Sequence, residues 1–86
     1  MPDSTTMGEP ESADRLQVLQ NACTAALNKY QNVAKQACEY MTSLSAPITF
    51  QQSIELIKWN KKEAFARDAY VSARDALVSY LISIYW

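Results

Sequence analysis

The chain has 86 residues, of which 49% are hydrophobic and 20% are charged, and its formal net charge is -1. A chain of this length builds one small core, so we expect a single domain that needs good helix packing, disulfides, a metal or a partner for stability. The absence of histidine and the presence of only two cysteines exclude histidine metal sites, Ser-His-Asp and Cys-His centres, and a disulfide scaffold. The near-neutral charge gives no general reason to expect nucleic acid or a membrane surface as a partner.

The composition favours helices. The only glycine is Gly8, twelve residues are alanine, and few turn residues occur between positions 11 and 86. This pattern is typical of long helices rather than short strands. We therefore predict an all-α fold, a helical hairpin with antiparallel helices over 12–44 and 49–85 and a turn over 45–48.

Residues 1–11 contain the glycine and two of the three prolines and have no apolar periodicity. We predict that this segment is a disordered leader. No basic residue precedes Arg15, so the segment lacks the basic start of a secretory signal. We expect a cytoplasmic protein, with signal-independent export as the open alternative.

The first predicted helix begins at Ser12, a suitable N-cap, and Asp14 in its first turn favours the helix dipole. From Leu16 onward, nine uncharged residues follow the alternating spacing of three and four that is typical of a coiled-coil seam. They are Leu16, Leu19, Cys23, Ala26, Tyr30, Val33, Ala37, Tyr40 and Leu44. The opposite face is rich in glutamine and asparagine, which suits a solvated face or a packing face within an assembly.

The turn has the sequence SLSAPIT over 43–49. Pro47 cannot continue the first helix, and it disfavours helical geometry at the residue before it. Thr49 and Gln52 have the spacing of a capping box, so the second helix is expected to start at Phe50.

The second helix carries two apolar stripes. The first stripe comprises Leu56, Trp59, Glu63, Ala66, Tyr70, Ala73, Leu77, Tyr80 and Ile84. The second stripe comprises Phe50, Ile54, Ile57, Ala64, Val71, Val78 and Ile82. A hairpin of two helices buries one stripe on each helix, so the second stripe requires a further surface to cover it.

The last eleven residues carry no charge and end in Tyr85 and Trp86. They are shorter than the ~20 apolar residues that span a bilayer. A partner, the first helix or a membrane surface are the three ways to cover them. We predict a partner-binding surface, and we expect the partner to be a second copy that completes a four-helix bundle or another helical protein. This surface consists of Ile54, Ile57, Trp59, Val71, Val78, Ile82, Tyr85 and Trp86.

Cys23 and Cys38 lie fifteen residues apart on one predicted helix, which separates their Cα atoms by about 22 Å. A disulfide needs Cα atoms within about 7 Å. We therefore expect reduced cysteines, as in a reducing compartment, with a covalent dimer through Cys38 as the alternative.

Lys58, Lys61 and Lys62 flank Trp59, an arrangement that suits weak nucleic-acid binding. The spacings of Glu55 to Lys58 and of Glu63 to Arg67 are equally those of ordinary surface ion pairs. The chain has no glycine-rich phosphate loop, and a two-helix chain offers no cleft for paired carboxylates. We expect no catalytic, cofactor or metal site, and a non-enzymatic function in protein–protein interaction or assembly.

The helix-proline-helix layout and the length resemble the needle subunits and small chaperones of type III secretion systems and the ESX-type secreted hairpins. The stretch QSIELIKW over 52–59 is similar to the needle subunits in character. ESX-type hairpins carry a Trp-x-Gly turn, whereas the turn here has neither residue. The resemblance implies a structural subunit or small chaperone of a bacterial secretion apparatus as an alternative function.

Overall fold

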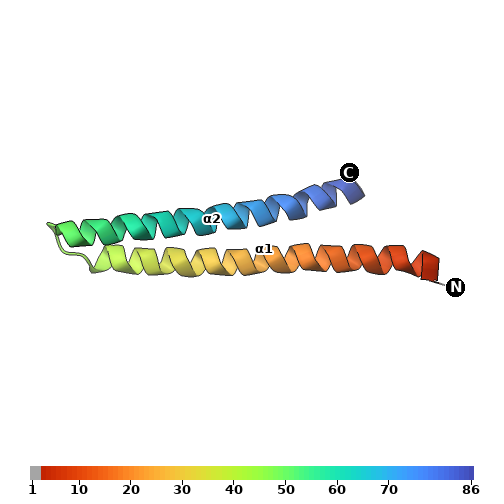
Figure 1. The fold of residues 1–86 in the computed structure, drawn as a ribbon, viewed down its shortest axis with the longest axis horizontal. Coiled ribbons are helices and arrows are strands. Elements are labelled where there is room, and N and C mark those ends of the chain that lie inside the picture. The colour runs from red at the N-terminus through yellow and green to blue at the C-terminus, as the bar shows by residue number, and fades with distance from the viewer. Residues whose placement is uncertain (1–2) are drawn as a thin grey trace.

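The computed structural model describes residues 3–86, with side chains from Ala13 onward. It contains two helices, α1 (Asp3–Ser43) and α2 (Phe50–Tyr85), which run antiparallel side by side and are joined by residues 44–49 (Figure 1). No strand occurs within residues 3–86. The predicted all-α helical hairpin is therefore confirmed, as an elongated molecule with extents of 71 × 21 × 15 Å.

Helix α1 begins at Asp3, earlier than the start at residue 12 that the sequence predicted. The predicted disordered leader thus overlaps the helical backbone from Asp3 to residue 11, while residues 1–2 lie outside the described part. The first turns of α1 extend past the C-terminal end of α2 (Figure 1). Because the seam pattern starts only at Leu16, apolar periodicity carries no information about helical turns that precede it.

The turn ends in the predicted capping box. The Thr49 side chain accepts a hydrogen bond from the Gln52 backbone N–H (3.1 Å), and the Gln52 side chain accepts one from the Thr49 backbone N–H (2.9 Å). Two N–H groups that helix geometry leaves without partners are thereby satisfied. Helix α2 accordingly starts at Phe50, as predicted.

The predicted seam of α1 is the face that contacts α2. All nine seam residues from Leu16 to Leu44 are half-buried, whereas the glutamines and asparagines of the opposite face between 17 and 36 are exposed. On α2, the first stripe is half-buried or buried from Leu56 to Tyr80, and only Ile84 at its end is exposed. The sequence therefore identified which of the two stripes on α2 packs against α1.

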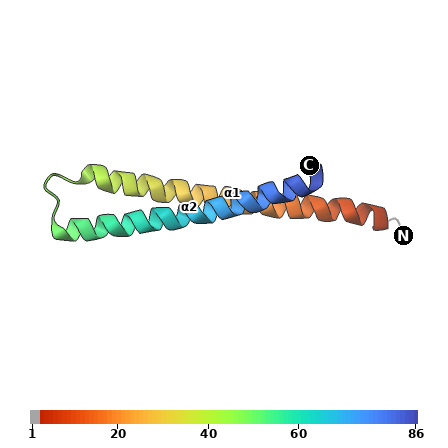
Figure 2. The ribbon, with the colours of Figure 1, turned by 90° about the horizontal axis from the view of Figure 1, so that it is seen from above.

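Aromatic side chains set the register along this seam. The rings of Tyr30 and Tyr70 stack with centroids 6.3 Å apart and an interplanar angle of 14°. Nearer the open end, the Arg15 guanidinium lies 5.5 Å from the centroid of the Tyr80 ring. Figures 1 and 2 together show that the two helices twist around each other, as helices do when their seam repeats every 3.5 residues.

Burial within this hairpin is sparse. Among the described side chains only Ala66, on the first stripe, is buried, with 3% exposure. The surface area is 6687 Å², whereas a compact monomer of 9.7 kDa exposes about 5,100 Å². Neither helix, over its described length, is apolar enough to cross a membrane.

Candidate interaction surface

The second stripe of α2 lies outside the seam. Phe50, Ile57, Val78 and Ile82 are between 44% and 80% exposed, and Ile54, Ala64 and Val71 are half-buried. The exposed large apolar side chains of this stripe thus lie toward the two ends of α2, and half-buried members lie between them. An apolar surface of this extent marks an interaction site more often than an ordinary solvated face.

The remaining predicted partner-binding residues divide into two groups. Tyr85 is 76% exposed and Trp86 is fully exposed, so the aromatic end does not pack back on α1. Trp59 is half-buried at the seam, where its ring is covered by the Lys62 ammonium group, 4.7 Å from the ring centroid. Trp59 therefore belongs mainly to the contact between the helices, and the exposed aromatic surface is at the C-terminus.

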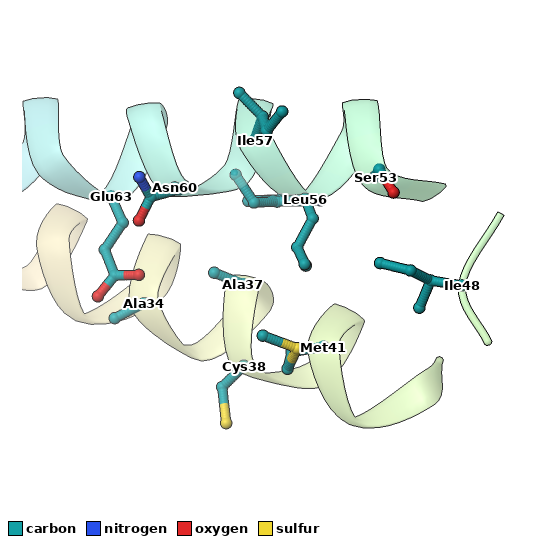
Figure 3. A pocket seen from close by; sticks show the side chains of 11 residues that line it. Ala34, Ala37, Cys38, Met41, Ile48, Ser53, Leu56, Ile57, Asn60 and Glu63 are labelled. Carbon is teal, nitrogen blue, oxygen red and sulfur yellow. The ribbon is translucent and has the colours of Figure 1, made fainter. Parts of the chain in front are cut away.

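Near the turn, α1 and α2 enclose an apolar groove with a volume of about 590 Å³. Ala34, Ala37, Cys38 and Met41 line it from α1, and Leu56 and Ile57 line it from α2. In Figure 3, Leu56 and Met41 lie on facing sides, and Ile48 stands at the turn end. Because Ile57 belongs to the second stripe, the groove and this stripe form one continuous surface.

The α1 side of this groove was not predicted from the sequence. Leu27, Ala34 and Met41 recur every seven residues and lie one position beyond the seam residues Ala26, Val33 and Tyr40. A sevenfold apolar repeat beside a coiled-coil seam indicates a helix with a second contact. This repeat was the available signal for the α1 side of the groove.

Charged side chains of α2 form ion pairs at its surface. Lys58 pairs with Glu55 as the sequence predicted (3.4 Å), whereas Arg67 lies near Asp68 (3.9 Å) rather than Glu63. All of these side chains are substantially exposed, and such pairs contribute little to stability.

A second hollow, of about 500 Å³, lies on the other side of the seam. Lys29, Lys61 and Lys62 line it together with Trp59 and Phe65. This is the basic and aromatic combination that suggested nucleic acid as an alternative. The Lys62 ammonium group beside the Trp59 ring occupies a position that a stacked base would need.

Both cysteines are free; Cys23 is half-buried and Cys38 is exposed at the groove. Within the described residues, no group of three or more cysteine, aspartate or glutamate side chains is placed to hold a metal ion. Comparison of the chain with protein-family models, with curated proteins and with solved structures finds no match.

Proposed function

We propose that this chain is a non-enzymatic interaction and assembly module that completes its core on a helical partner. The observation that carries the proposal is the imbalance between burial and exposure on α2. Ala66 is the one buried side chain among those described, while the second stripe, the groove and the aromatic end expose large apolar groups. Small domains with so little core gain stability from association.

The groove supports binding rather than catalysis. Its lining is mainly alanine, leucine, isoleucine and methionine, and Glu63 is the only carboxylate among the lining residues. A general acid–base or nucleophilic mechanism needs at least two chemical groups in mutual reach. An apolar side chain or helix is the ligand that such a lining fits.

The helix-proline-helix layout suits a structural subunit or small chaperone of a bacterial secretion apparatus as one form of this function. That form predicts that deletion of Tyr85 and Trp86 stops polymer growth while the hairpin remains folded. Nucleic-acid binding has less support, because the Trp59 ring is half-buried and already covered by Lys62. We place the protein in the cytoplasm, where its cysteines stay reduced.

The experiment compares the wild type with the triple variant Ile54→Gln, Val71→Gln and Val78→Gln. A matched control, Val18→Gln with Phe65→Gln, removes apolar side chains that are 64% and 74% exposed outside the second stripe. Sedimentation velocity reports association, and circular dichroism reports helicity. We expect the triple variant to lose association before helicity and the control to behave as the wild type.

If the wild type is a monomer that precipitates, and the triple variant stays in solution, the same function is supported with a different protein as partner. The proposal is contradicted by a soluble, stable monomer whose association, solubility and unfolding midpoint equal those of the triple variant.

A further inference from the structure

The second stripe has a symmetric arrangement along α2. Phe50, Ile57, Ala64, Val71 and Val78 recur every seven residues, and Tyr85 continues the series. If α2 is reversed about the midpoint between Arg67 and Asp68, each member falls on another apolar member. Phe50 falls on Tyr85, Ile57 on Val78, and Ala64 on Val71.

We propose that a second copy of this chain covers the second stripe, with the two α2 helices antiparallel about a two-fold axis at residues 67 and 68. This inference rests on the proposed function and specifies its partner. A two-fold interface is self-complementary, since residue i contacts residue j of the other copy and j contacts i. The reversed stripe meets this requirement over its sevenfold series, and Ile54 is level with Leu81, one residue from Ile82.

The charges beside the stripe favour the antiparallel orientation. In this register Arg67 of one copy faces Asp68 of the other and Asp68 faces Arg67, so the axis carries two opposite-charge pairs, while Lys61 is level with Arg74 and one residue from Asp75. A parallel pairing sets Arg67 against Arg67 and Asp68 against Asp68, which is repulsive. Within each chain, Arg67 also lies 3.9 Å from Asp68.

The same register covers the aromatic end. It brings Trp86 of the second copy level with Thr49, beside Ile48 and the groove that Met41 and Leu56 line near the turn (Figure 3). Trp86 is fully exposed in the single chain, and Tyr85 is 76% exposed. One contact therefore covers the stripe, the aromatic end and the mouth of the groove.

The available area approaches that of a standard dimer interface. Helix α2 has 36 residues, so it is about 54 Å long, and a face one helix wide covers about 600 Å² in projection. A standard interface buries about 800 Å² of accessible surface on each partner. The projected face therefore supplies about three quarters of that area, and the groove near the turn continues it.

Disulfide trapping tests this register. In a background with Cys23→Ala and Cys38→Ala, one chain carries Ile57→Cys and the other Val78→Cys. The register places the two introduced thiols opposite each other, whereas two Ile57→Cys chains hold theirs about 30 Å apart along the axis, beyond the reach of a disulfide. We expect a covalent dimer from the mixture under mild oxidation and near-complete loss of that species when either variant is oxidised alone.

A charge-reversal series is a second test of the register, for the case that the cysteine variants fold poorly. Arg67→Asp and Asp68→Arg singly are expected to raise the dimer Kd several-fold, and the double variant is expected to restore it, because both side chains are exposed.

A dimer that cross-links through either single variant, or that shows no charge rescue, overturns the register and leaves the proposed function intact. A monomer at every concentration overturns the second copy as partner, and the polar triple variant then decides whether the proposed function fails as well.

Discussion

Replacing Ile57 by serine removes an apolar side chain from the part of the second stripe nearest the turn. Ile57 is 52% exposed in the single chain, and full burial of an isoleucine contributes about 1.5–3 kcal/mol. Covering the exposed half therefore contributes about 1 kcal/mol per copy and about 2 kcal/mol per symmetric dimer. The dimer Kd should rise about 30-fold. Isoleucine and serine have similar helix propensities, so the helicity of the associated chain should change little.

Sedimentation equilibrium over a range of concentrations measures this Kd. Phe65→Ser is the matched control, because Phe65 is 74% exposed on the same helix but lines the basic hollow on the other side of the seam. The control should leave the Kd within about twofold of the wild type, as is typical of surface substitutions within ±0.5 kcal/mol. Equal effects of the two substitutions, or no effect of Ile57→Ser, would refute the assignment of the interface to the second stripe.

Three further predictions concern the cap, the thiols and the surface charges. Thr49→Ala removes the capping box and should lower the free energy of unfolding by about 1 kcal/mol, which is a fall in Tm of about 4–8 °C at fixed concentration. The control Thr42→Ala, inside α1, should lower the Tm by clearly less. Equal falls in Tm for the two variants would argue against the cap. In dilute protein, Cys38 should react with a thiol reagent faster than Cys23. The reaction of Cys38 should become slower as the protein concentration rises, because association covers the groove. A Cys38 reaction rate that does not change with concentration would place the partner elsewhere. Glu55→Gln should change the free energy of unfolding by less than about 0.5 kcal/mol because its ion pair with Lys58 is exposed, and a larger loss by urea unfolding would contradict this.

The features predicted correctly from the sequence are those that local chemistry determines. Thr49 and Gln52 form their box because both partners lie within one turn and need nothing from the rest of the fold. The seam of α1 was predicted residue by residue because the spacing of uncharged residues from Leu16 to Leu44 places them on one face of any helix.

The features that the sequence did not predict depend on how the two helices are placed relative to each other and on side-chain rotamers. The groove near the turn has the small side chains of Ala34 and Ala37 on its α1 side, which leave space between the helices, and sequence periodicity does not report that separation. The start of α1 at Asp3 lies beyond the end of α2, where no packing partner imposes an apolar pattern. Arg67 lies near Asp68 rather than Glu63, since exposed ion pairs respond to rotamers more than to spacing.

The most direct test of a hairpin completed by a second copy is its mass in solution. Light scattering behind size exclusion over a hundredfold concentration range measures this mass, and circular dichroism on the same samples measures helicity. We expect a helical species whose mass approaches twice 9.7 kDa as concentration rises. A fully helical species that stays at 9.7 kDa throughout would contradict this expectation.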